Sequence, residues 1–267
     1  MSARVLRLLA VAWLLGLSIA PAALAHELPA EQVRAVRFDP HPGQQVPGEL
    51  GFTDENGQAV TLGTYFRDKP VILSLNYFHC QNLCLLELQG LVSGLNGLPF
   101  TVGDQFSLLT VSFDSRELPA DAAAAKFKAF RGYVHPEAAA GWHLLTTSNQ
   151  ATIDALTQAV GFNYVYDAQE NDYAHPAGVT VLTPSGQVSR YLYGLDFSAT
   201  DLRLALVEAA ANHIGSVVEQ VLLVCYHYDP ISGRYTPLVM NVIKVAATAT
   251  CLVVGGGLFF LWRAERR

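Results

Sequence analysis

Apolar residues in the middle of this chain form continuous runs that alternate with amphipathic stretches. Short continuous apolar runs predict strands that are buried on both faces, and apolar residues at helical spacing predict helices. We expect strands at residues 71–78, 106–113, 142–145, 179–183 and 188–193. We expect helices at residues 83–95, 122–132, 150–160 and 200–213. A hairpin is also predicted at residues 52–61, where Asn56-Gly57 supplies the turn.

The order of these elements predicts the fold class. Strands that alternate with helices are typical of an α/β domain whose central mixed sheet is covered by helices on both faces. Ligands of such sheets bind at the carboxyl ends of the strands. Two cysteines, Cys80 and Cys84, directly follow the strand at residues 71–78. We therefore expect the functional site at this end of the sheet.

The first 25 residues have the layout of a secretory signal peptide. Arg4 and Arg7 precede an apolar run, and Ala23-Leu24-Ala25 resembles a cleavage site. An uncleaved anchor helix is the alternative, but the run is short for a membrane span and Pro21 interrupts it. Residues 26–47 are rich in Pro, Gly and Gln and are expected to form an extended leader before a compact domain at residues 48–213.

A second apolar segment lies at residues 238–262, after a juxtamembrane segment at residues 214–237. It is long enough to cross a bilayer as one helix. The five residues that follow it, 263–267, include three arginines, and positive charge marks the cytoplasmic side of a span. The sequence therefore predicts a single-pass protein of the inner membrane, with a cytoplasmic tail and its main domain in the periplasm.

The charge distribution limits the classes of partner. The formal net charge of the whole chain is −6. Residues 26–237 contain 11 lysines and arginines and 22 aspartates and glutamates, so this part alone carries −11. Such an acidic domain argues against electrostatic binding of nucleic acid or anionic lipid. It is compatible with a metal cation or a basic protein surface, and equally with a charge that only maintains solubility.

The spacing of Cys80 and Cys84 supports two kinds of chemistry. In a helix, residues i and i+4 are neighbours, so both thiolates can bind one metal ion, or the two sulfurs can form a disulfide. Thiolates combined with an imidazole suit copper, whereas a structural zinc site requires four protein ligands. An exported domain can also hold a purely structural disulfide. The spacing alone leaves these alternatives open.

The Cys-x-x-x-Cys loop after an apolar strand resembles the SCO/SenC family of thioredoxin-like copper proteins. The Thr110-Val111-Ser112-Phe113-Asp114 segment and a distant histidine before a hairpin strand resemble it as well. The resemblance implies a thioredoxin-like fold and a copper site formed by Cys80, Cys84 and His175. It also implies a role in assembling the copper centre of cytochrome c oxidase. Leu85 stands where the family usually has proline, and the expected anchor is C-terminal, which indicates a divergent member.

We therefore expect a metallochaperone that delivers copper to the copper-bearing subunit of the oxidase. The alternative is a thiol-disulfide oxidoreductase that keeps the cysteines of that subunit reduced, with Cys80 as the attacking and Cys84 as the resolving thiol.

Other histidines and cysteines are weaker candidates for metal binding. His79 is a second candidate ligand, although it is expected to point away from Cys80. Cys225 and His227 could form an accessory copper or docking site, but an aromatic belt above the membrane is the better explanation of that segment. His135 and His143 are expected to be structural or solvated.

Overall fold

The computed structural model describes residues 29–80 and 83–214, together with residues 228–229, 234–235, 248 and 250. The predicted signal peptide, the tail at residues 263–267, Cys225 and His227 lie outside the described residues. So does the predicted membrane span at residues 238–262, except for two positions within it. No helix among the described residues combines the length and the apolar composition needed to cross a bilayer.

The chain divides into two compact units, residues 1–35 and residues 36–267. In the first unit the described part is a short helix, α2 (Ala30–Ala35), which has no buried residue. The second unit contains the central sheet and the other described elements.

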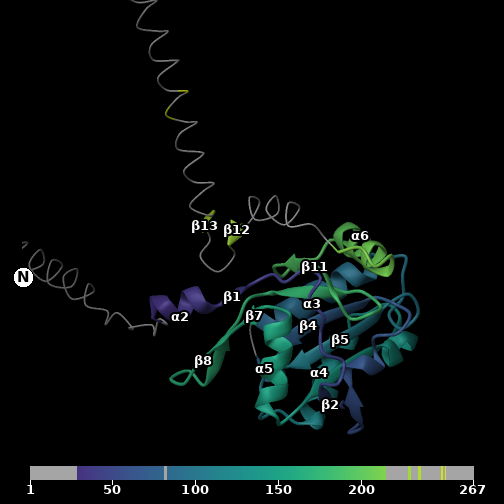
Figure 1. The fold of residues 1–267 in the computed structure, drawn as a ribbon, viewed down its shortest axis with the longest axis horizontal. Helices are drawn as coiled ribbons and strands as arrows, with labels where there is room; N and C mark the ends of the chain where they lie inside the picture. The colour runs from purple at the N-terminus through teal and green to yellow at the C-terminus, as the bar shows by residue number, and fades with distance from the viewer. Residues whose placement is uncertain are drawn as a thin grey trace, which may run out of the picture. The chain divides into compact units, whose positions relative to one another are not determined.

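Within the described residues, seven strands form one mixed sheet in the order β11-β10-β4-β5-β6-β2-β3 (Figure 1). Its strands are β2 (Gly51–Asp54), β3 (Ala59–Thr61), β4 (Val71–Asn76), β5 (Ser107–Ser112), β6 (Trp142–Thr146), β10 (Gly178–Leu182) and β11 (Val188–Tyr193). β4, β5 and β6 run parallel, and the other neighbours are antiparallel. This arrangement confirms the predicted central mixed sheet.

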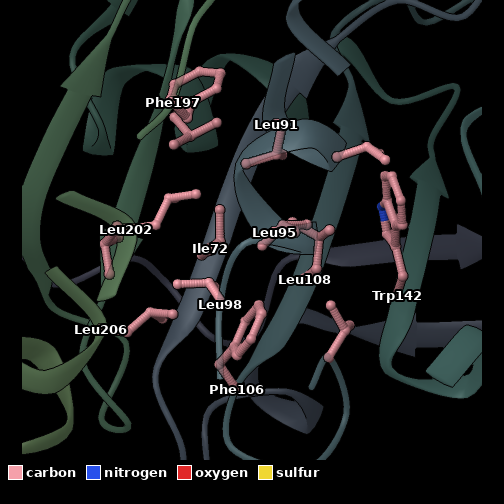
Figure 2. Packing of buried hydrophobic residues seen from close by; sticks show 14 of the residues in the cluster. Ile72, Leu91, Leu95, Leu98, Phe106, Leu108, Trp142, Phe197, Leu202 and Leu206 are labelled. Carbon is pink, nitrogen blue, oxygen red and sulfur yellow. The ribbon is translucent and has the colours of Figure 1, made fainter. Parts of the chain in front are cut away.

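The two faces of the sheet carry separate hydrophobic cores, because successive residues of a strand point to opposite faces. On one face Ile72 and Leu108 pack against α3 (Leu83–Asn96), α4 (Pro119–Phe130) and α6 (Ala199–Ala210). Figure 2 shows Leu91 and Leu95 of α3 among these side chains. On the other face the sheet packs against α5 (Gln150–Ala159). Every residue of β4 is consequently buried, as its continuous apolar run predicts.

The remaining elements are short. They are the 3-10 helices η1 (Leu62–Thr64) and η2 (Pro136–Gly141) and the strands β1 (Arg37–Phe38), β7 (Phe162–Asn163), β8 (Val165–Asp167), β9 (Asp172–Ala174), β12 (Tyr228–Asp229) and β13 (Arg234–Tyr235). β8 and β9 form an antiparallel hairpin, and so do β12 and β13.

The segment expected to be an extended leader is partly built into the compact unit. β1 pairs with β7 in antiparallel register, and the ring of Phe38 packs edge-on against Phe162. Val46 is fully buried, and its N–H donates to the carbonyl oxygen of Gly186 at 3.0 Å. The compact unit therefore starts before residue 48, because isolated apolar side chains in a Pro- and Gly-rich segment are buried by distant partners.

A close approach between α3 and the loop before α6 generates the first prediction. A Cβ atom added at Gly94 would lie 2.2 Å from the carbonyl oxygen of Phe197 and 2.7 Å from Cδ1 of Leu202. Gly94→Ala should therefore lower the free energy of unfolding by about 2 kcal/mol, although alanine favours helices. Urea denaturation measures this change. Ser93→Ala, at an exposed position of the same helix, is the control, and equal stability of both variants would contradict the packing described here.

Candidate metal centre

The two cysteines lie at the connection between the end of β4 and the start of α3. The N–H of Cys80 donates to the carbonyl oxygen of Tyr77 at 3.3 Å, which closes a turn after the strand. Cys84 lies in the first turn of α3 and is buried, whereas Cys80 is partly exposed. The N–H of Cys84 donates to Sγ of Cys80 at 3.3 Å. Cys80 is therefore the more accessible of the two cysteines.

His175 reaches the cysteines through the pairing of two strands that are distant in sequence. β10 runs antiparallel to β4, with Val179 opposite Ser74, so the start of β10 lies beside the end of β4. His175 precedes β10, and its side chain is buried, with 2% exposure. Its Nε2 lies 2.9 Å from Sγ of Cys84, and its Nδ1 lies 3.0 Å from the carbonyl oxygen of Pro176. If Nδ1 carries the proton and donates to that carbonyl, Nε2 is available as a metal ligand.

One donor atom each from Cys80, Cys84 and His175 can be chosen so that all three lie within 4.8 Å of one another. Among the described residues this is the one group of three or more His, Cys, Asp and Glu side chains with such geometry. Burial, together with the neighbouring Cys80, raises the pKa of the Cys84 thiol. A metal ion would offset this cost, because it binds the deprotonated sulfur. Two soft sulfurs and one imidazole nitrogen form a donor set that fits copper.

Aromatic rings surround the imidazole of His175. The ring centroids of Phe113, Phe162 and Tyr77 lie 5.3, 6.0 and 6.2 Å from its ring. These contacts limit the rotation of the imidazole and exclude water from its faces. Sequence analysis did not identify this wall, because its members come from three separate segments.

A buried carboxylate, Glu87, connects the elements behind the site. It is 0% exposed. Its Oε1 accepts hydrogen bonds from Oγ of Ser74 at 3.0 Å and Nδ2 of Asn76 at 3.3 Å, and its Oε2 accepts one from the N–H of Gly178 at 3.1 Å. Glu87 thus ties α3, which carries Cys84, to β4 and to the start of β10. Sequence analysis missed this residue, although a lone acidic residue among apolar neighbours of a helix was a usable signal.

His79 lies outside the group of converging donor atoms. Its Nδ1 faces Oε1 of the buried Glu117 at 2.9 Å, its Nε2 lies 3.5 Å from Oδ1 of Asp121, and its side chain is 68% exposed. The His79 side chain therefore contacts α4 and the loop that precedes it. His135 and His143 are also absent from the group, and the ring of His143 packs 4.7 Å from that of Tyr65.

Comparison with known proteins identifies the family of the chain. The model of the SCO1/SenC family matches residues 39–209, which is more than half of the chain. The chain belongs to the SCO1/SenC family. A search of curated protein sequences found no match. The family match covers all three residues of the candidate site.

Solved structures of similar fold include a protein of Aquifex aeolicus VF5 that is named for electron transfer. It is 27% identical, with a TM-score of 0.57, and the match covers 65% of this chain and 96% of that one. A SCO1/SenC family lipoprotein from Bacillus anthracis is 14% identical, with a TM-score of 0.51 and coverage of 63% and 97%. Arabidopsis thaliana ScoI with copper bound is 16% identical, with a TM-score of 0.50 and coverage of 63% and 99%. These likenesses confirm the thioredoxin-like α/β fold.

The environment of Glu87 generates a prediction about pH. Burial raises the pKa of this carboxyl from its ordinary value of 4.5 to about 7. A group whose pKa is raised on folding contributes stability below its unfolded value and loses that contribution as the pH rises through its folded value. As the pH rises from about 4.5 to about 7, the free energy of unfolding of the wild type should therefore fall relative to that of Glu87→Gln.

Urea denaturation of the reduced, metal-free proteins across this range measures the difference. Glu49→Gln, at a position that is not buried, controls for the removal of one carboxylate. Parallel stability curves for the wild type and Glu87→Gln would show that the buried carboxyl does not titrate in this range.

Proposed function

We propose that this protein binds copper through Cys80, Cys84 and His175 and transfers it during assembly of cytochrome c oxidase, to the copper-bearing subunit. The observation that carries the proposal is the convergence of two sulfurs and one imidazole nitrogen at the carboxyl end of β4. The copper-bound structure of the similar Arabidopsis protein supports the choice of metal.

The composition of the site favours copper over a structural zinc ion. Structural zinc sites use four protein ligands, and among the described residues no further His, Cys, Asp or Glu joins this group of three. Soft thiolates with one imidazole suit Cu(I). A site with three ligands leaves a position through which a ligand of the acceptor can bind.

The unequal exposure of the sulfurs suggests how transfer begins. Cys80 is partly exposed, whereas Cys84 and His175 are buried. An incoming thiolate of the acceptor would bind the copper ion from the side of Cys80, and the bond from copper to Sγ of Cys80 would then break. One copper–sulfur bond forms as another breaks, so the oxidation state of the metal does not change.

We place the copper-binding domain in the periplasm and anchor it in the inner membrane. The support is the sequence: a signal-peptide pattern at residues 1–25 and an apolar segment at residues 238–262 followed by arginines. Tethering would raise the effective concentration of the domain near a membrane-bound oxidase. The acidic charge of residues 26–237 offers no support for a nucleic-acid partner.

A thiol-disulfide oxidoreductase is the second candidate. The observation that favours it is the pairing of a partly exposed cysteine with a buried one, in which the N–H of Cys84 donates to Sγ of Cys80 at 3.3 Å. In that reaction Cys80 attacks a disulfide of the partner, and Cys84 then displaces the partner's thiol, so that the Cys80–Cys84 disulfide forms. These two steps require no metal, and His175 could take part in them only as an acceptor of the Cys84 thiol proton, since its Nε2 lies 2.9 Å from that sulfur.

A titration with Cu(I) under anaerobic, reducing conditions tests the copper proposal. The wild type should bind one copper ion per chain, and His175→Ala should bind it at least about tenfold more weakly, because one of three ligands is lost. His213→Ala, at an exposed position, is the matched control and should bind as the wild type does.

The same three proteins discriminate between the two functions. Equal copper affinity of the wild type and His175→Ala would contradict the three-ligand site and leave the oxidoreductase as the better account. A disulfide reductase assay should then show turnover by the wild type and by His213→Ala, and none by a Cys80→Ala variant.

A further inference from the structure

The turn at residues 114–117, between β5 and α4, contacts both segments that carry the candidate ligands. Asp114 and Glu117 are buried, with 5% and 3% exposure. The N–H of Glu117 donates to the carbonyl oxygen of Asp114 at 3.1 Å, and Oγ of Ser112 donates to Oε2 of Glu117 at 2.5 Å. The turn is thus fixed by its own hydrogen bonds and can serve as a rigid support.

On the cysteine side the support acts through Glu117. Its Oε1 accepts a hydrogen bond from the N–H of His79 at 2.8 Å and also faces Nδ1 of His79 at 2.9 Å. His79 directly precedes Cys80 in the chain. Glu117 therefore holds the turn that carries the exposed sulfur.

On the histidine side the support acts through Arg116. Its Nη1 donates to Oδ1 of Asn171 at 3.1 Å, and its guanidinium carbon lies 5.1 Å and 5.6 Å from the ring centroids of Tyr166 and Tyr173. These three residues belong to the β8–β9 hairpin, whose last residue directly precedes His175. Arg116 therefore holds the β8–β9 hairpin, and His175 is the residue that follows this hairpin.

The clamp requires a guanidinium group in particular. Nε and Nη2 of Arg116 form a two-pronged ion pair with Asp114, at 2.8 and 2.7 Å. Although burial acts in the opposite direction, the hydrogen bonds and charge of Arg116 keep the pKa of Asp114 below its ordinary value. A planar guanidinium can pair with a carboxylate and stack on aromatic rings at the same time, whereas an ammonium group cannot.

We propose that Arg116 is a positioning residue for His175: it fixes the β8–β9 hairpin to the turn whose other arm holds the cysteines. This turn then connects the histidine side of the site to the cysteine side, in addition to the pairing of β10 with β4. This inference rests on the proposed copper function. According to this inference, Arg116 affects metal affinity by positioning His175, and it positions neither cysteine.

The test is a double-mutant cycle on Cu(I) affinity with Arg116→Ala and His175→Ala. Loss of a residue that orients a metal ligand typically weakens metal binding by about tenfold or more, so Arg116→Ala alone should weaken binding by about tenfold. In the His175→Ala background the same substitution should have no further effect, because the residue through which Arg116 acts is gone. Arg190→Ala, which breaks an ion pair with Glu208 on α6, is the matched control and should bind as the wild type does.

Two further measurements separate positioning from general loss of structure. The rate at which a thiol reagent modifies the partly exposed Cys80 should be the same in metal-free Arg116→Ala and the wild type, because Glu117 still holds the cysteine turn. Tyr166→Leu, which removes the clamp from the hairpin side at a position that is 42% exposed, should weaken copper binding in the same direction.

An equal loss of affinity from Arg116→Ala in both backgrounds, or no loss in either, would overturn the positioning role. If His175→Ala weakens copper binding but Arg116→Ala does not, the proposed function survives and the role of Arg116 fails. If neither substitution changes copper binding, both proposals fail.

Discussion

The antiparallel pairing of β10 with β4 is the constraint on which the site depends. Cys84 and His175 are separated by 91 positions in sequence, yet Sγ of one lies 2.9 Å from Nε2 of the other. This distance is possible because the register that pairs Val179 with Ser74 brings the start of β10 to the end of β4. A shift of one residue would reverse the faces of all side chains of the strand, so the buried apolar residues of both strands fix the register.

Polar groups placed inside the protein maintain that junction. Glu87 accepts hydrogen bonds from two residues of β4 and from the first N–H of β10, and it does so with no exposure to solvent. Glu117 is the corresponding acceptor on the cysteine side. Buried carboxylates are costly unless they are hydrogen-bonded, so their presence at both sides of the site indicates that position rather than stability is the benefit. Glu117 holds the turn before Cys80, and Cys80 itself remains partly exposed.

The regular parts of the fold were predictable because their patterns are local. β4 follows from a continuous apolar run, the β2–β3 hairpin from Asn56-Gly57, and the helix after the cysteines from apolar spacing. His175 was assigned from the family resemblance, because a single histidine carries no local signal. The β8–β9 hairpin, the wall around Phe113 and the burial of Val46 were missed. Each of them depends on contacts between distant segments, which no local pattern encodes.

In the proposed site, one copper ion binds both sulfurs and the imidazole together. X-ray absorption spectroscopy of the full-length protein, loaded anaerobically with an equimolar amount of Cu(I), examines this coordination directly. The structure predicts a three-coordinate copper ion with two sulfur ligands and one nitrogen ligand that shows the outer-shell scattering of an imidazole. A spectrum that contains sulfur ligands alone would contradict the claim, because His175 would then lie beside the metal without binding it.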